Sequence, residues 1–235
     1  MSLVSHRGAA GLAHENSWKA ISLAKKYNPI FIEVDVHRTS DGVFVMYHGD
    51  IKQTYNGNDR PETYDQLKKE IPSLLTLEEL LTKDDQGVPF MFDIKCADSV
   101  YDLITFLRIH SLPKGSGFTT PHESSLDALK KAFPDSITLI SQKYQAGPIR
   151  AIELARDRGF SGISLNKWWL GPLPYLMCKF YKKQIMVYTI NHKLWMRFAQ
   201  KLYPNIMLCT NYPDIYRSVY SQDDKRIYSK TNVKI

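Results

Sequence analysis

Two pairs of charged side chains, each separated by one residue, lie in apolar surroundings. Glu33 and Asp35 form one pair, and Asp93 and Lys95 form the other. Residues i and i+2 of a strand point to the same face, so each pair would present both charged groups together. Hard oxygen ligands without a cysteine or a histidine pair favour Mg²⁺ or Ca²⁺ over zinc. A divalent metal held by Glu33, Asp35 and Asp93 is one interpretation, and ion pairs of Glu33 and Asp35 with Arg7, Lys95 or Arg38 are the other.

Basic residues accompany these acids. Arg7 follows the first apolar run, Leu3 to Ser5, and Lys95 follows Asp93 at a spacing of two. If Arg7 and Lys95 lie at the same site as a metal, their positive charge and that of the metal exceed the negative charge of the acids. A bound anion would then balance the site. A metal flanked by arginine and lysine suits a phosphate ester, because the charge on its non-bridging oxygens must be neutralised as the bond breaks.

Two histidines stand close to the same elements. His6 ends the first apolar run, and His48 follows the run Val43 to Tyr47. Imidazole titrates near neutral pH, so two histidines on either side of a phosphoryl group can act as general base and general acid. We therefore predict that His6 and His48 are the catalytic pair.

Short apolar runs of strand length alternate with amphipathic stretches along the whole chain. The runs are Leu3 to Ser5, Pro29 to Val36, Pro89 to Ile94, Gly117 to Thr119, Ser136 to Ser141, Gly162 to Leu165, Gln184 to Ile190 and Asn205 to Cys209. The stretches are Ser17 to Tyr27, Leu77 to Lys83, Val100 to His110, Ser124 to Phe133, Gly147 to Arg158 and His192 to Lys201. Eight strands alternating with helices in 235 residues predict an α/β fold, a (β/α)₈ TIM barrel. Catalytic groups of such barrels lie at the carboxyl ends of the strands.

One segment interrupts the alternation after the second strand. Thr39-Ser40-Asp41-Gly42 before the run Val43 to Tyr47 predicts a hairpin turn, because Asp-Gly accepts positive φ. Residues 49–72 are polar and read as a small insertion over the mouth. We expect one barrel domain over residues 1–220, and a basic C-terminal tail over residues 221–235.

Composition places the chain among ordinary globular proteins. It has 43% hydrophobic and 23% charged residues, and no apolar stretch approaches the ~20 residues of a transmembrane helix. Three scattered cysteines predict neither a disulfide framework nor a zinc site. The start of the chain does not read as a secretory signal, so we expect a cytoplasmic protein. The net charge of +7 lies largely in dispersed pairs, which indicate solvated helix faces rather than a nucleic-acid surface.

Taken in order, the motifs resemble the glycerophosphodiester phosphodiesterase family. His6-Arg7-Gly8, Glu15-Asn16-Ser17, Ile32 to Val36, Thr39 to Gly42 and His48 are similar to the family pattern in order and spacing. The similarity continues through Asp93-Ile94-Lys95, Val187 to Asn191 and Thr210 to Pro213, and so covers roughly residues 3–217. This chain has Asp93 where the family usually has glutamate, and Asn211 where aspartate is common.

The resemblance implies a metal-dependent hydrolase of glycerophosphodiesters that yields an alcohol and glycerol 3-phosphate. The implied metal ligands are Glu33, Asp35 and Asp93. His6 and His48 would be the acid/base pair, with Arg7 and Lys95 as phosphate contacts. The reaction implied by the family begins with attack by the neighbouring glycerol hydroxyl, which gives a cyclic phosphate that water then opens.

Four further residues are candidates for supporting or substrate-contacting roles. They are Glu15, Trp168, Tyr188 and Asn191. An aromatic group such as Trp168 leaves open a lysophospholipase D on the same barrel, whose substrate would be a lysophospholipid. A third reading is a non-catalytic barrel that binds phosphate or nucleic acid. We expect a small-molecule substrate and no nucleic-acid partner, with the head group and the oligomeric state left open.

Overall fold

Eight parallel strands close into a ring in the computed structural model, which describes residues 1–49, 62–83, 87–141 and 147–220. The strands are β1 (Ser2–Ser5), β2 (Phe31–Arg38), β5 (Phe90–Ile94), β6 (Gly117–Thr120), β7 (Ile137–Ser141), β8 (Gly162–Asn166), β9 (Gln184–Tyr188) and β10 (Met207–Thr210). Closure runs through β1, where Val4 pairs with Phe31 of β2 and with Cys209 of β10. The prediction of a TIM barrel is confirmed, and each expected strand is present.

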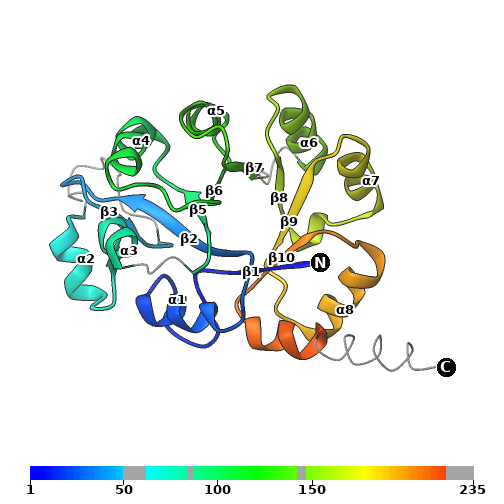
Figure 1. Ribbon diagram of the computed structural model, residues 1–235, viewed down its shortest axis with the longest axis horizontal. Helices are drawn as coiled ribbons and strands as arrows, with labels where there is room; N and C mark the ends of the chain where they lie inside the picture. The colour runs from blue at the N-terminus through cyan, green and yellow to red at the C-terminus, as the bar shows by residue number, and fades with distance from the viewer. Residues whose placement is uncertain (50–61, 84–86, 142–146, 221–235) are drawn as a thin grey trace, which may run out of the picture.

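Helices surround the ring of strands (Figure 1). They are α1 (Trp18–Lys25), α3 (Leu77–Lys83), α4 (Val100–Ile109), α5 (Glu123–Ala132), α6 (Gly147–Asp157), α7 (Pro172–Phe180) and α8 (Lys193–Leu202), with 3₁₀ turns η1 (Ala97–Ser99) and η2 (Lys167–Trp169) and a further helical segment at 213–220. Helix α7 was not among the predicted helices. Its first turn holds Pro172 and Pro174, which a helix accepts there because the first amides have no partner within the helix.

Two extra strands lie outside the ring. β3 (Phe44–Met46) pairs antiparallel with β2, with Val36 opposite Met46, which confirms the predicted hairpin. β4 (Leu75–Thr76) pairs with β3 and was not predicted.

The predicted insertion, residues 49–72, holds a helix in its described part. Residues 50–61 lie outside the described residues. α2 (Tyr64–Glu70) is capped by Thr63, whose side chain accepts a hydrogen bond from the Gln66 amide while the Gln66 side chain accepts one from the Thr63 amide. Leu67 of this helix packs with Val45 and Leu74 in a small cluster beside the barrel. The tail predicted for residues 221–235 also lies outside the described residues.

The barrel interior changes from apolar to polar along the strands. At its amino end the interior is filled by a cluster of Val4, Phe31, Met91, Leu139, Met186, Met207 and Cys209. Two residues further along three of these strands stand polar or charged groups: Glu33, Asp93 and Ser141. Because every second residue of a strand faces inward, the apolar layer closes the bottom and the polar layer lines the mouth.

Candidate active site

The turn after β1 places the first catalytic candidates at the mouth. Arg7 and Gly8 both have positive φ, 51° and 78°, and Gly8 donates a backbone hydrogen bond of 3.1 Å to the Glu33 carbonyl. A Cβ at Gly8 would lie 2.7 Å from the backbone carbon of Ala20 in α1. Glycine is therefore required here by both conformation and space, and it fixes the direction in which His6 and Arg7 leave the strand.

Three carboxylates come together between β2 and β5. The strand register places Asp35 directly opposite Asp93, and Glu33 precedes Asp35 by two residues on the same face. One oxygen from each of Glu33, Asp35 and Asp93 lies within 4.8 Å of the others. The structure thus assembles the three acidic residues that the i, i+2 spacing predicted would share a face.

Two cations contact the same carboxylates. Asp35 Oδ2 lies 3.1 Å from Arg7 Nε, and its Oδ1 lies 3.2 Å from Lys95 Nζ. Lys95 Nζ also donates a hydrogen bond to Asp93 Oδ2. Of the two residues in the ion-pair interpretation, Asp35 is therefore paired with Arg7 and Lys95, and Asp93 shares Lys95 with it. Among the described residues, Glu33 has no lysine or arginine side chain within 4.0 Å.

The electrostatics of the cluster divide the three acids. Burial and the nearby charge of Asp35 raise the pKa of Glu33 well above its usual value. Burial also raises the pKa of Asp93, more than Lys95 lowers it. Burial would raise the pKa of Asp35 too, but Lys95 and Arg7 hold it below the usual value. A further positive charge nearby would therefore lower the pKa values of Glu33 and Asp93 and favour their ionised forms.

The donor set fits a divalent cation. Asp93 Oδ1 is buried and has no hydrogen-bond partner among the described residues, and one carboxylate oxygen of Asp93 belongs to the cluster with Glu33 and Asp35. A second group, His6, Glu33 and Cys209, is also close enough to hold an ion. Burial and the Glu33 carboxylate raise the pKa of the Cys209 thiol well above its usual value, so this group offers no ready thiolate. The oxygen set is the better site for Mg²⁺ or Ca²⁺.

His6 is held in one tautomer. Its Nδ1 lies 2.6 Å from Asn211 Oδ1, and because an amide oxygen only accepts, Nδ1 carries the proton. Nε2 then has a free lone pair and lies 3.8 Å from Glu33 Oε2. Burial and the charge of Arg7 lower the pKa of His6 to about 4. At neutral pH His6 is an unprotonated imidazole that can accept a proton.

His48 follows β3 and is more exposed than His6. Its side chain is 46% exposed, and its Nδ1 lies 3.9 Å from Glu15 Oε1. The other oxygen of Glu15 accepts a 2.7 Å hydrogen bond from Arg7 Nη1. Glu15 therefore lies between Arg7 and His48.

A cavity of about 340 Å³ joins these groups. Six of the predicted site residues line it: His6, Arg7, Glu33, His48, Asp93 and Lys95. Tyr188 lines it as well. The far wall consists of neutral polar side chains from β6, β7 and β8, namely Thr119, Ser141, Ser164 and Asn166. Sequence reasoning did not select these residues, because single hydroxyl and amide groups on strands carry no distinctive spacing.

Four of the sequence candidates do not line the cavity: Asp35 and Glu15, described above, and Trp168 and Asn191. Trp168 is 68% exposed and packs edge-on against Trp195 of α8, with ring centroids 6.1 Å apart. Asn191 accepts hydrogen bonds from the Asn211 backbone (2.9 Å) and the Thr210 hydroxyl (3.1 Å). It therefore positions the loop that holds His6 and does not face the cavity.

Two asparagines contribute without having been selected. Asn16 is buried with φ of 53°, and its side chain both donates to Asp35 Oδ2 (3.0 Å) and accepts from the Asp35 amide (3.2 Å). Asn211 orients His6, as described above. A polar residue next to Glu15 within a motif was a usable signal for Asn16, whereas the contact of Asn211 with His6 spans 205 positions.

Comparison with known proteins identifies the family. The sequence model of the glycerophosphoryl diester phosphodiesterase family matches residues 6–150, which contain His6, both carboxylate strands and His48. The chain belongs to this family. Its resemblance to the family motifs is thereby confirmed.

One curated relative matches this chain over a short stretch. The protein YhdW of Bacillus subtilis, which bears the name of a glycerophosphodiester phosphodiesterase, is 44% identical over 59 residues. That match spans 25% of this chain and 24% of YhdW, so it covers about a quarter of the curated relative.

Solved structures of family proteins share the fold over nearly the whole chain. A protein of Agrobacterium tumefaciens, named for the same activity, superposes with a TM-score of 0.80 at 20% identity and covers 96% of this chain and 99% of that one. A phosphodiesterase of Oleispira antarctica, solved with sn-glycerol-3-phosphate as product, has a TM-score of 0.73 at 17% identity and covers 95% and 97%. At these identities the likeness establishes the barrel.

Proposed function

We propose that this protein hydrolyses glycerophosphodiesters to an alcohol and glycerol 3-phosphate. The observation that supports it most is the joint exposure, in one cavity, of two histidines, two carboxylates, an arginine and a lysine: His6, His48, Glu33, Asp93, Arg7 and Lys95. A phosphodiester needs this combination, because positive groups bind its anionic oxygens while two proton carriers serve the bonds that form and break.

The proposed metal ligands are Glu33, Asp35 and Asp93, whose oxygens cluster within 4.8 Å. A bound Mg²⁺ or Ca²⁺ would supply Lewis-acid polarisation of the phosphoryl oxygens. Lys95 and Arg7 complete the anion site from the side of Asp35 and keep that carboxylate ionised. Asp93, one methylene shorter than the usual glutamate, keeps one oxygen for Lys95 and leaves the other without a partner.

The state of each histidine supports a division of labour. His6 is unprotonated at Nε2, so we assign it as the base that removes the proton of the attacking glycerol hydroxyl. The imidazolium that forms lies 3.8 Å from the Glu33 carboxylate. His48 lies on the solvent side, near Glu15, and we assign it as the acid that protonates the departing alkoxide.

The reaction then balances in two steps. In the first, the glycerol oxygen bonds to phosphorus, its proton passes to His6, and the bond to the alcohol breaks as His48 gives up its proton. In the second, water opens the cyclic phosphate to glycerol 3-phosphate, and the two histidines exchange roles.

The neutral wall of the cavity favours a polar head group. Thr119 and Ser141 hydrogen-bond to each other at 2.7 Å and face the cavity with Ser164 and Asn166. Trp168, the residue that left a lysophospholipid substrate open, does not line the cavity. We therefore propose a small water-soluble diester as substrate. Three buried thiols without a disulfide agree with the cytoplasmic location that we also propose.

The proposal is tested by turnover with defined substrates. Purified protein with Mg²⁺ or Ca²⁺ should release glycerol 3-phosphate from glycerophosphocholine, measured with a coupled dehydrogenase, and a chelator should abolish the release. Lysophosphatidylcholine should turn over more slowly. No release from any glycerophosphodiester with either metal would refute the proposed activity, and faster turnover of lysophosphatidylcholine would identify a lysophospholipase D.

A further inference from the structure

The face of the barrel formed by α7 and α8 carries an unusual share of exposed apolar side chains. Of the fourteen large hydrophobic residues exposed among the described residues, nine lie between positions 168 and 202. Leu173, Leu176 and Phe180 of α7 are 57%, 59% and 79% exposed. Their spacing of three and four residues places them on one stripe of the helix, turned away from the barrel. A monomeric protein rarely leaves such a stripe in water without a use for it.

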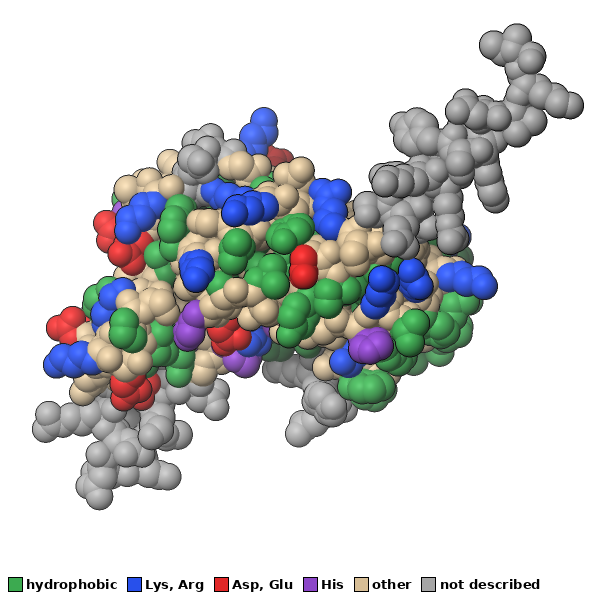
Figure 2. Space-filling model, turned by 90° about the horizontal axis from the view of Figure 1, so that it is seen from below, with side chains coloured by type: hydrophobic (Ala, Val, Ile, Leu, Met, Phe, Trp, Pro, Cys, Tyr) green, Lys and Arg blue, Asp and Glu red, His purple; other side chains and the backbone are tan. Residues whose placement is uncertain are grey.

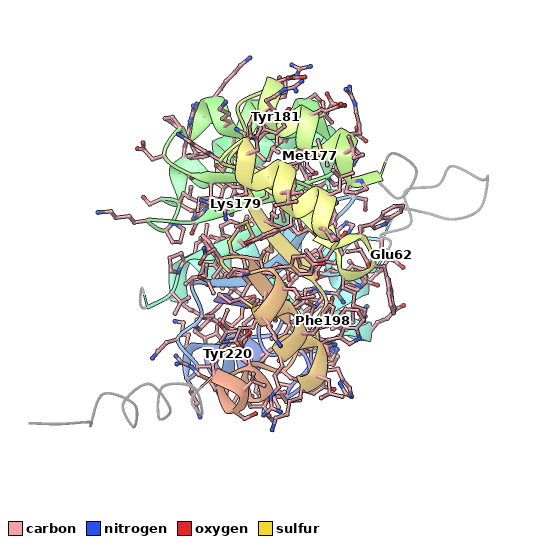
Figure 3. The ribbon with its side chains drawn as sticks, turned by 90° about the vertical axis from the view of Figure 1, so that its right-hand side faces the viewer. Glu62, Met177, Lys179, Tyr181, Phe198 and Tyr220 are labelled. Atoms are coloured by element: carbon pink, nitrogen blue, oxygen red, sulfur yellow. The ribbon has the colours of Figure 1, made fainter. Side chains whose placement is uncertain are left out.

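Helix α8 continues this surface toward the cavity mouth. Leu194, Trp195, Phe198 and Leu202 are all exposed on α8, and Trp195 contacts Trp168 of η2 and Phe198, with centroids 6.1 and 5.5 Å apart. The two helices are neighbours, because Tyr175 of α7 packs on Tyr203 after α8 at 5.3 Å. Figure 3 shows α7 and α8 on the flank of the barrel that faces the viewer, with Met177 and Lys179 labelled on α7 and Phe198 on α8.

The same region holds the positive charge of the chain. Residues 158–213 contain eight lysines and arginines and no aspartate or glutamate. The rest of the chain has 23 basic and 24 acidic residues, which gives it a net charge of −1. The net charge of +7 for the whole chain therefore comes from residues 158–213. The basic pairs are dispersed along the sequence, as noted above, but the acids that would offset them are missing from this segment.

Cations border the apolar stripes directly. Lys179 of α7 is exposed beside Phe180, and Lys193, Arg197 and Lys201 are exposed on α8. Lys167 lies over the ring of Trp168, 5.2 Å from its centroid. Figure 2 shows green and blue side chains together on the right-hand part of the molecule, where α8 lies. Exposed Trp, Phe and Leu flanked by Lys and Arg is the pattern of a helix that lies in the interface of an anionic bilayer.

We infer that the α7–α8 face, with η2, docks reversibly on an anionic lipid surface. The apolar stripes would enter the head-group region while the surrounding lysines and arginines contact lipid phosphates. A second copy of this chain is a poorer occupant, because it would bring two acid-free faces of the same charge together. Nucleic acid would match the charge but not the aliphatic residues Leu173, Leu176 and Leu194. Because η2 follows β8, whose Asn166 lines the cavity, docking would bring the mouth close to the membrane.

The test is vesicle binding by the full chain, measured by co-sedimentation with phosphatidylcholine vesicles with and without phosphatidylserine. Binding should require phosphatidylserine and weaken as salt is raised. The double variant Leu176→Ser/Phe180→Ser should bind at least ~10-fold more weakly, as expected for two lost apolar anchors. The double variant Tyr101→Ser/Ile109→Ser on α4 is the matched control, since these residues are 74% and 73% exposed, and it should bind like the parent.

The charge component has its own pair of variants. Arg197→Glu should lower binding by at least about fivefold, the value of one basic residue near an anionic surface, whereas Lys131→Glu on the exposed face of α5 should not. Far-UV circular dichroism spectra and thermal midpoints equal to those of the parent would exclude misfolding of the variants as the cause of weaker vesicle binding. Four outcomes would overturn the inference: no vesicle binding; equal losses for the α7 and α4 variants; a dimer by light scattering that the α7 variant abolishes; or tight binding of DNA or RNA through Arg197 with no binding of vesicles.

Discussion

The two halves of the cavity wall differ in chemistry although they share one architecture. The half built from β1, β2 and β5 contributes His6, Arg7, Glu33, Asp93 and Lys95. The half built from β6, β7 and β8 contributes hydroxyls and an amide and, among the described residues, no charged group. Both halves use the same inward-facing strand positions. The barrel therefore sets where a side chain points, and residue type alone decides whether that part of the mouth does chemistry or only shapes the space.

The side chains of the two halves also differ in how many contacts they make with one another. On the charged half, Asp35 contacts Arg7, Lys95 and Asn16, and Arg7 in turn contacts Glu15. On the neutral half, Thr119 and Ser141 form the one hydrogen bond between side chains among the described residues that line the cavity. Removal of one charged partner leaves a buried charge uncompensated, whereas removal of one hydroxyl costs a single neutral hydrogen bond. Substitutions on the two halves should consequently differ by orders of magnitude in effect.

The largest expected effect is on the metal. Asp93→Ala removes the oxygen that has no hydrogen-bond partner, so the variant should bind Mg²⁺ or Ca²⁺ weakly and lose activity, while Asp93→Glu should keep a substantial part of both. Isothermal titration with each ion reports binding without reference to turnover. Equal metal affinity of Asp93→Ala and the parent would exclude Asp93 as a ligand.

The histidines come next. His6→Ala and His48→Ala should each lower kcat by roughly 10²–10⁴-fold on glycerophosphocholine, the usual contribution of general acid–base catalysis. KM should change far less, because neither group binds the phosphate in its ground state. Small and equal losses in both variants would show that the two residues have structural roles only.

A pH effect on stability should come from the charged half. The pKa of His6 is lowered from 6.5 to about 4 in the folded protein, so the unfolded chain takes up this proton at higher pH than the folded one. The free energy of unfolding should therefore fall as pH drops from 6.5 toward 4, by at most about 3 kcal/mol for this group.

The measurement is denaturant unfolding of chelator-treated protein at a series of pH values. His6→Asn should remove part of the fall between pH 6.5 and 4, and Ser164→Ala on the neutral half should not. An identical slope in His6→Asn and the parent would contradict the burial of a neutral His6.

The smallest effect is expected on the neutral wall. Ser164→Ala removes one hydroxyl from the cavity and should change kcat/KM by less than about tenfold, mostly through KM. Comparison of diesters with different head groups would show which alcohol this wall contacts. A loss in kcat as large as that of His6→Ala would break the division between the two halves.

The sequence predicted the charged half of the cavity wall better than the neutral half. The acids of β2 and β5 were predicted to share a face because strand alternation is a local rule, and Asp35 does stand opposite Asp93. Both options left open for the carboxylates have structural support, since Asp35 is paired with Arg7 and Lys95 while Glu33 and the free oxygen of Asp93 fit a metal. Spacing could not choose between them, because the answer depends on burial.

Other features were beyond sequence reasoning for physical reasons. The contact of Asn211 with His6 exists only because β10 closes the ring against β1, a pairing of the two ends of the barrel. The neutral wall is assembled from one residue per strand. Helix α7, with prolines in its first turn and apolar residues on its exposed side, lacks the usual polar face. For Trp168 a supporting and a substrate-contacting role were both open, and in the structure it packs on Trp195 of α8.

The most direct test of the proposed mechanism is a change of leaving group. When the substrate is a nitrophenyl diester of glycerol 3-phosphate, nitrophenolate leaves without being protonated, so only the base remains essential. If His6 is the base and His48 the acid, His48→Ala should recover most of the parental kcat on this substrate, whereas His6→Ala should stay roughly 10²–10⁴-fold slower, as on glycerophosphocholine. Recovery of His6→Ala instead would reverse the assignment, and recovery of neither variant would contradict acid–base catalysis by this pair.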